Sequence, residues 1–223
     1  MTQIEVEESA IKLRNALESS ASSVRLQAAL TAGSAPIPGY IDVLIDRCAI
    51  EPDFYVRDML TWALIRNDAS AVAERLLTEL GSDVTQARAQ ALHTLSKLGH
   101  PDTWPAITSA LLQDEDDEVA RAAWRTAAGL VPSGGEADLA ETLSTQFNRG
   151  DREVQLSLSR AFAALGEGAT AVVERATTDS DTGVRAHALA TEILMQDPDE
   201  GFDAAIAEAR RVVALRDSPV VKD

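Results

Sequence analysis

A short helical motif recurs along this chain at nearly constant spacing. Aligning the segments on the first residue of a Val-Arg pair gives intervals of 32, 31, 32, 35 and 30 residues. A period in this range, held six times, is typical of repeat proteins and argues against a single globular core. The aligned residues, called position 0 below, are Val24, Val56, Ala87, Val119, Val154 and Val184.

Each period contains two helices. Before each aligned helix lies a segment whose apolar residues recur three and four apart, such as Val72, Leu76 and Leu80, which indicates a one-faced helix. Polar turns separate the two, and we expect Asp53, Asp151 and other turn residues such as Asp181 to cap the helices that follow. Aromatic residues make up only 4% of the chain and alanine is abundant, which favours an all-α fold.

The pattern D-x-x-V-R-x-x-A-x-x-A-L on the second helix of each pair resembles the HEAT repeat family in its short bacterial form. The resemblance covers residues 20–195, and it departs from the pattern at Ala120 and Gln155, which replace the arginine. It implies a right-handed α-solenoid of about six stacked helical hairpins, with the second helices lining a concave face. We expect one repeat domain over 1–215, closed by a capping helix over 201–215, and a frayed tail over 216–223.

Helical periodicity predicts which residues of an aligned helix are buried. Positions 0, 4 and 8 share a face, as in Val56, Leu60 and Leu64, and we expect them to form the core. Position 1 lies beside that face and repeatedly holds arginine. The family resemblance implies that this arginine pairs with an aspartate of a neighbouring hairpin; the arginines concerned are Arg25, Arg57, Arg88 and Arg185.

Positions 2, 6 and 10 point away from the core and form the candidate partner-binding surface. We expect Trp62 to be exposed there beside Arg66, a composition typical of binding hot spots. Alanines at the last aligned helix, Ala186 and Ala190, occupy the same positions. The candidate partner-binding residues are Asp58, Trp62, Arg66, His93, Lys97, Arg121, Arg125 and Arg160.

The net charge of −16 argues against nucleic acid and anionic membranes as partners of the whole molecule. The candidate surface is nevertheless locally basic, which favours an acidic partner segment. Self-association, with the acidic convex face of one copy on the basic groove of another, is a variant of this hypothesis. The acidic N-terminus has no signal-peptide pattern and no apolar run is long enough to span a bilayer, so we expect a cytoplasmic protein.

The sequence offers no pattern for catalysis, a metal or a cofactor. The three histidines lack metal-ligand spacing, and Cys48 lies in an apolar helical stretch that predicts a buried thiol. We find neither a phosphate-binding glycine loop nor a nucleophile motif. We therefore expect no catalytic residues, no metal and no cofactor.

Three functions are compatible with such a chain. The leading hypothesis is a non-enzymatic scaffold that binds a protein or peptide through the concave face. The second is a DNA-binding protein or an enzyme similar to the HEAT-like alkylpurine DNA glycosylases, with Asp58, Trp62 and Arg66 imitating their base-binding residues. The third is a lyase similar to the HEAT-like enzymes that attach bilins, which only the repeat supports.

Overall fold

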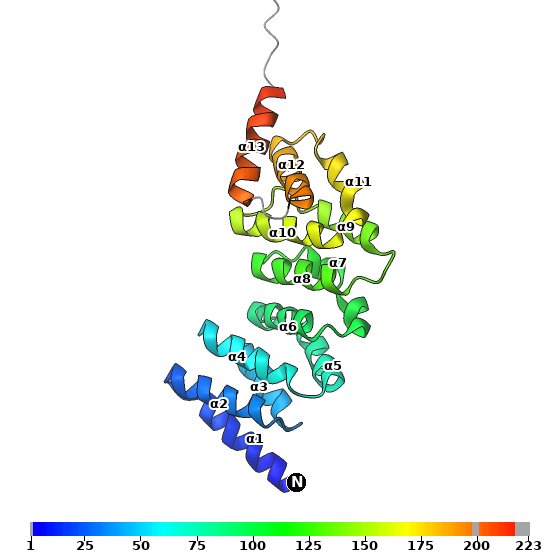
Figure 1. Ribbon diagram of the computed structural model, residues 1–223. Helices are drawn as coiled ribbons and strands as arrows, with labels where there is room; N and C mark the ends of the chain where they lie inside the picture. The colour runs from blue at the N-terminus through cyan, green and yellow to red at the C-terminus, as the bar shows by residue number, and fades with distance from the viewer. Residues whose placement is uncertain (1, 198–200, 217–223) are drawn as a thin grey trace, which may run out of the picture. The chain divides into compact units, whose positions relative to one another are not determined.

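The computed structural model describes residues 2–197 and 201–216, and within these ranges every regular element is a helix (Figure 1). The all-α prediction is therefore confirmed. In chain order the helices are α1 (Gln3–Leu17), α2 (Ser22–Ser34), α3 (Tyr40–Cys48), α4 (Phe54–Ile65), α5 (Ala69–Glu79), α6 (Thr85–Leu98), the 3₁₀ helix η1 (Pro101–Ala106), α7 (Ser109–Leu112), α8 (Asp117–Leu130), α9 (Glu136–Ser144), α10 (Arg152–Leu165), α11 (Glu167–Ala176), α12 (Thr182–Gln196) and α13 (Phe202–Arg216).

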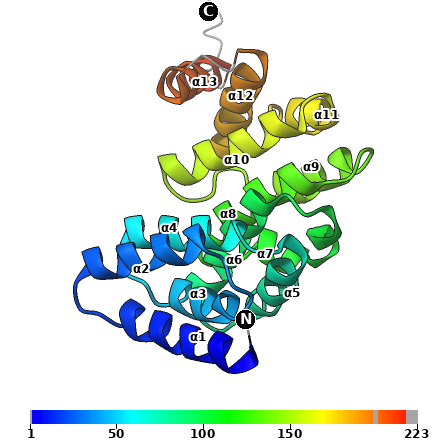
Figure 2. The ribbon, with the colours of Figure 1, turned by 60° about the horizontal axis from the view of Figure 1, so that its bottom comes forward.

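The chain divides into two compact units, the first ending at Ile107 and the second beginning at Thr108. In unit 1 the aligned helices α2, α4 and α6 pack side by side in one layer, and α1, α3 and α5 pack side by side in the other. Figure 2 shows α1 and α3 in a row beneath α2 and α4. Within unit 1, α2 and α4 thus each pack both on the helix before them and on the next aligned helix, and α6 packs on α5 and on α4.

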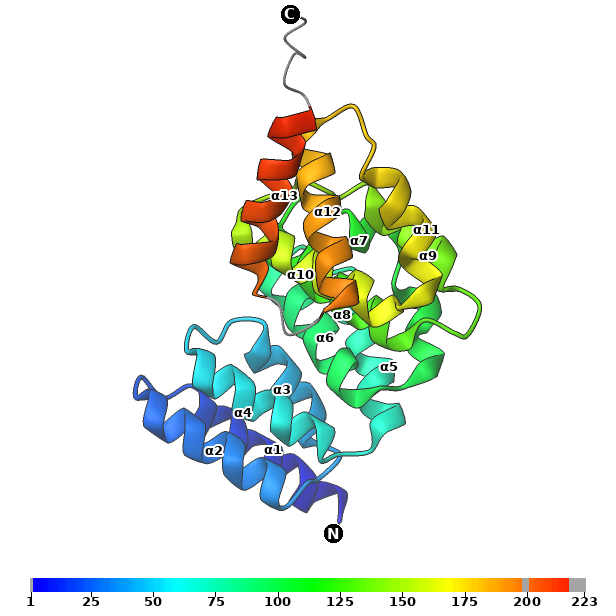
Figure 3. The same cartoon turned by 45° about the horizontal axis from the view of Figure 1, so that its top comes forward.

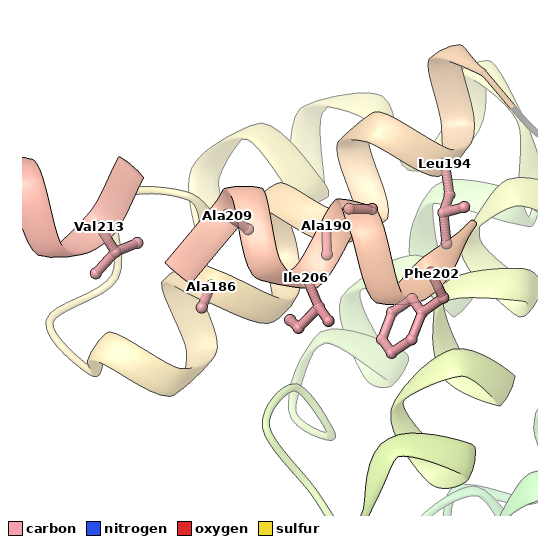
Figure 4. Packing of buried hydrophobic residues seen from close by; sticks show 8 residues of the cluster. Ala186, Ala190, Leu194, Phe202, Ile206, Ala209 and Val213 are labelled. Atoms are coloured by element: carbon pink, nitrogen blue, oxygen red, sulfur yellow. The ribbon is translucent and has the colours of Figure 1, made fainter. Parts of the chain in front are cut away.

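Unit 2 has the same two layers, α8, α10 and α12 in one and α7, α9 and α11 in the other. Its last helix, α13, lies along α12 (Figure 3). Phe202, Ile206 and Val213 of α13 bury themselves against small residues of α12, and Figure 4 shows the labelled side chains facing one another. Ala186 and Ala190 are therefore covered by α13 and do not belong to an open face, contrary to the expectation from their positions. The predicted tail over 216–223 lies outside the described residues except for Arg216, which ends α13.

The core positions are predicted correctly in the interior of each unit. Position 0 is at most 4% exposed in α4, α6, α8 and α10, where the residues are Val56, Ala87, Val119 and Val154. In α2 the pattern shifts by one residue. Val24 is 47% exposed, whereas Arg25 is buried together with Ala29 toward α4.

The arginine at position 1 has a structural role. Its guanidinium reaches the turn of its own hairpin, and Arg25 in addition pairs with Glu51, a glutamate rather than an aspartate of the next hairpin. In the turn of its own hairpin, the arginine Nη1 donates to the carbonyls six and five residues earlier: Arg57 to Glu51 and Pro52 at 2.8 and 2.9 Å, and Arg185 to Asp179 and Ser180 at 2.8 and 2.9 Å. Arg25 binds Ser19 and Ser20 in the same way, and Arg88 binds Ser82. The motif therefore supplies hydrogen bonds to carbonyls of the turn, which lie beyond the last residue of the preceding helix.

Two hairpins lack this arginine. In α8 the position is held by Ala120, and Arg149, from the turn before α10, reaches the equivalent carbonyls of Asp114 and Glu115 at 2.5 and 3.1 Å. Arg149 also donates to Asp117 at 2.8 Å and lies over the buried Trp124 ring. In α10 the position is held by Gln155, whose amide donates to the carbonyl of Gly150 at 3.5 Å.

The segment TWPAITSALLQ before α8 has the apolar residues of the first helix of a pair, but it does not form one continuous helix. It is broken into η1 and the short α7, because Pro105 lacks an amide hydrogen and restricts Trp104 before it. The boundary between the two compact units falls in this same segment, between Ile107 and Thr108.

Candidate functional site

The outer face of α4 carries an unusual concentration of aromatic side chains. Phe54 is 65% exposed and Tyr55 is 74% exposed, and their rings meet edge to face with centroids 5.6 Å apart. Trp62 follows two turns after Tyr55 and is half-buried. Three of the nine aromatic residues of the chain therefore share one face of one helix. Ile65 is exposed on the same face. We call Phe54, Tyr55, Asp58, Trp62, Ile65 and Arg66 the α4 face.

The buried residues on the opposite side of α4 show that the α4 face points outward. Val56, Leu60 and Leu64 are at most 1% exposed, so the residues two positions after each of them point outward. The helix starts at Asp53, whose carboxylate accepts the N–H groups of Tyr55 and Val56 at 2.9 and 3.2 Å. Phe54 and Tyr55 are thus held on the first turn, and Trp62 on the third, of a capped helix with a buried opposite side.

The sequence predicts an exposed Trp62, but the structure shows its side chain half-buried. A Cβ on Gly33 of α2 would lie 2.6 Å from Cε3 of the Trp62 ring and 2.9 Å from Cα of Ala63. The indole therefore lies over the glycine, and α2 and α4 approach closely because position 33 has no side chain. This contact immobilises the ring and leaves part of it accessible, which reduces the entropy lost when a ligand binds.

The other predicted residues of unit 1 lie on α4 and on its neighbour α6. Asp58 and Arg66 are exposed on the α4 face, one turn before and one turn after Trp62. On α6, Lys97 is exposed and His93 is half-buried. Because α4 packs against α6, the structure brings these five predicted residues into one layer of unit 1.

The remaining predicted residues lie on α8 and α10 in unit 2. Arg121 is half-buried and pairs with Glu118 at 2.7 Å. Glu118 is not at one of the positions that define the predicted surface, and its negative charge compensates part of the charge of Arg121. Arg125 and Arg160 are exposed. Desolvation, and secondly the charge of Arg121, lowers the pKa of Arg125. An anion brought to this place would offset the repulsion between the two guanidinium groups.

Phe54, Tyr55 and Ile65 were not among the sequence-predicted site residues. They occupy positions −2, −1 and 9 relative to Val56, just outside the three positions that define the predicted surface. A wider angular window around Asp58 and Trp62 on the same helical wheel would have included them. The signal was therefore present in the sequence, in the clustering of aromatic residues within a chain that has few.

The buried side chains with strongly shifted pKa values belong to the packing. Burial alone would raise the pKa of Glu51, but hydrogen bonds from Arg25, from the N–H of Asp53 and from Arg47 outweigh it and lower the pKa to about 2. Arg25 binds this carboxylate with two hydrogen bonds of 2.8 and 2.7 Å. Burial raises the pKa of the Cys48 thiol to about 12, which makes it a poor nucleophile.

In unit 2, burial and hydrogen bonds likewise determine the protonation of His187. Its Nδ1 accepts the backbone N–H of Asn148 at 3.0 Å, so the ring proton is on Nε2, 3.0 Å from the carbonyl oxygen of Gln155. Burial lowers the pKa of His187 to about 4, against the smaller effect of the Gln155 hydrogen bond. The imidazole is 1% exposed and therefore out of reach of a substrate.

Among the described residues, no three or more His, Cys, Asp or Glu side chains gather closely enough to hold a metal ion. Likewise, none of the helices over 2–197 and 201–216 combines the length and the apolar character that crossing a membrane requires. A scan against models of protein families found no match to this chain, and a search of curated proteins found none either.

Proposed function

We propose that the protein is a non-enzymatic scaffold that binds another protein or peptide, and that the α4 face is the centre of its binding surface. The observation that carries the proposal is the exposure of Phe54 and Tyr55 beside the partly accessible Trp62. Exposed aromatic side chains on a rigid helix are the typical anchors of protein interfaces. The stacking of helices within each unit supports the accompanying proposal of a right-handed solenoid of about six HEAT-like hairpins, capped by α13.

The partner that fits this surface combines apolar side chains with acidic ones. The aromatic residues offer area for apolar contact, and Arg66 and Lys97 offer positive charge in a protein whose net charge is −16. An acidic, partly apolar peptide gains from both features, whereas a strongly basic partner would instead bind the acidic remainder of the molecule.

The test is affinity capture from an extract of the source cells, followed by measured dissociation constants for any protein that binds. Tyr55→Ala and Trp62→Ala should each weaken binding about 30-fold or more if the aromatic side chains are hot spots. Leu77→Ala is the matched control, because this leucine is exposed at 36% on α5 in the other layer. Retention of every bound protein by both aromatic variants would overturn the proposal.

Gly33→Ala tests the positioning of Trp62 without substituting any residue of the α4 face. The added methyl group would displace the indole, so we expect weaker binding and altered tryptophan fluorescence. Gly129→Ala is its control, because nothing lies within 4 Å of a Cβ placed at this helical position. This control should leave binding unchanged.

Binding to duplex DNA tests the DNA hypothesis. Affinity for DNA that falls steeply with salt and is lost in Arg125→Glu would favour that hypothesis over a protein partner.

A further inference from the structure

A groove lies between α1 and α2 at the edge of unit 1, away from the α4 face. Its volume is about 500 Å³, and its lining includes Leu13, Ala16, Val24 and Ala28 together with Lys12 and Tyr40. Val24 and Ala28 occupy positions 0 and 4 of the repeat, which are core positions in the other aligned helices. The groove is therefore a stretch of core surface that no described helix covers.

The exposure of Val24 shows how much covering is missing. Val24 is 47% exposed, whereas Val56, Val119 and Val154 at the same position are at most 4% exposed. In α4 and α10 the preceding aligned helix, α2 or α8, packs alongside. Inside unit 1, α2 has such a neighbour only on its α4 side. An additional helix placed on the free side would bury the same positions that are buried elsewhere.

The groove is nearly uncharged in a strongly acidic molecule. Helix α2 contains no acidic residue, and its only arginine, Arg25, is 6% exposed and bound to Glu51. Lys12 is the single charged residue in the groove lining. Two copies with a net charge of −16 repel each other, and this repulsion is smallest where the contacting surfaces carry no negative charge. Depletion of charge at the centre is also the composition typical of protein interfaces.

The last aligned helix restricts how a second copy can use the groove. Head-to-tail addition would require the corresponding surface of α12, where Ala186, Ala190 and Leu194 lie at positions 2, 6 and 10. Helix α13 already covers these residues. A second copy therefore has the uncovered α2 surface to offer, and pairing the same surface from both copies gives a closed two-fold contact.

We infer that two copies of this chain associate through their α1/α2 grooves, with the two α2 helices antiparallel across a two-fold axis. A helix of 13 residues is about 20 Å long, and two such helices side by side present about 400 Å². This area is below the roughly 1,000 Å² that stable specific interfaces bury, so we expect weak association, with a dissociation constant on the order of 100 µM or more. The contact uses a different face from the one in the proposed function and does not depend on it.

Sedimentation equilibrium of the full chain between about 10 and 500 µM tests the inference. The wild type should show monomer and dimer, with a larger dimer fraction when salt rises from about 0.05 to 0.5 M, because salt screens the repulsion between the copies. Val24→Asp should weaken association at least about tenfold, since it places an unpaired carboxylate in the apolar contact of each copy. Leu77→Asp is the matched control, with the same type of change at an exposed position on α5.

Cross-linking tests the geometry. Gln27 lies at the middle of α2 in the groove, so a two-fold axis brings its two copies together. Gln27→Cys should form a disulfide-linked dimer on mild oxidation, and the native Cys48 is buried and does not compete. Thr78→Cys on the exposed surface of α5 should remain monomeric at the same concentration.

A wild type that stays monomeric over the whole concentration range would overturn the inference and leave the groove to a different helix. Association that is unaffected by Val24→Asp, or equal cross-linking of Gln27→Cys and Thr78→Cys, would overturn it as well. Circular dichroism of each variant shows whether the fold is retained. Because Val24 and Gln27 are exposed, we expect the variants to fold.

Discussion

Arg149 performs, from the turn before α10, the task that the repeat assigns to an arginine on α8. Its guanidinium contacts the carbonyls of Asp114 and Glu115, which stand in the same relation to Ala120 as Glu51 and Pro52 stand to Arg57. The carbonyls thus obtain a donor in both cases, although the donor comes from a different place in the chain. Carbonyl pairing, rather than the identity of one residue, is what the repeat maintains.

This substitution predicts a compensating pair of variants. Arg149→Ala should lower the free energy of unfolding by about 2 kcal/mol, because charged hydrogen bonds to two carbonyls and to Asp117 are lost. Ala120→Arg alone should cost about 1–3 kcal/mol, since Ala120 is 0% exposed. The double variant should be more stable than the sum of the two changes, because the new arginine can take over the carbonyls.

Urea unfolding followed by the fluorescence of Trp124 measures the three free energies, and the double-mutant cycle gives the coupling. Arg160→Ala, at an exposed position on α10, is the control and should change the free energy by less than about 0.5 kcal/mol. Additive effects of the two substitutions would contradict this interpretation.

At the scale of single residues, the sequence predicts burial better than it predicts partners. Periodicity identifies Val56, Leu60 and Leu64 as core residues, because the rotation per residue along a helix is fixed and residues four apart therefore lie on the same face. It does not reveal that the Arg57 guanidinium turns back to the carbonyls of its own turn, because this depends on the turn conformation. Nor does it reveal that Trp62 rests on Gly33, since that contact joins residues of two helices.

At the scale of helices, α13 covers the side of α12 that no other aligned helix of unit 2 covers. Phe202→Ala should destabilise unit 2 by about 3–5 kcal/mol, because Phe202 is 4% exposed against α12. Amide hydrogen exchange in α13 should accelerate most, since its remaining contacts with α12 are largely small side chains. Ala204→Ser, at an exposed position on α13, should leave the exchange rates nearly unchanged. Unaltered protection of α13 in Phe202→Ala would show that the aromatic ring does not hold the helix.

The aligned helices and α13 could all be placed from the sequence, because each has the apolar spacing of a one-faced helix. The segment before α8 could not. Its apolar residues fit a helix, but Pro105 and the preceding Trp104 do not permit one, and the chain forms η1 and α7 instead. The shift in α2 was also missed, because the repeat pattern cannot show that Val24 lacks a covering helix.

At the scale of the whole molecule, the two units should respond differently to acid. The pKa of His187 in unit 2 is about 4 in the folded state and near its ordinary 6.5 when unfolded. The unfolded state therefore binds the proton first, and the stability of unit 2 falls as pH decreases from about 6.5 to 4, by about 3 kcal/mol in total. The Glu51 carboxylate of unit 1 has a folded pKa of about 2 against an ordinary 4.5, so its contribution is lost only below about pH 4.5.

Between about pH 6.5 and 4.5, unit 2 should therefore weaken while unit 1 does not. Trp124 fluorescence, in a Trp62→Phe and Trp104→Phe background, reports unit 2. The rate at which a dithiodipyridine reagent reaches the buried Cys48 reports unit 1. His187→Gln should remove the pH dependence of unit 2 in this window, because its amide oxygen can accept the Asn148 N–H without titrating. A pH-independent Trp124 transition in the unaltered His187 protein would contradict the prediction.

The reach of Arg149 into the preceding turn also limits how this chain can be rearranged. Modules that stack only through their helices can be deleted, duplicated or exchanged one at a time. Here the turn before α8 relies on a side chain that is supplied by the following turn, so the segment from α7 to α10 forms a tandem that would have to be moved as one block. Recombination within that tandem would separate the turn before α8 from Arg149, which replaces the missing arginine. Recombination next to the hairpins of Arg57 or Arg185 would keep each arginine together with the carbonyls that it binds.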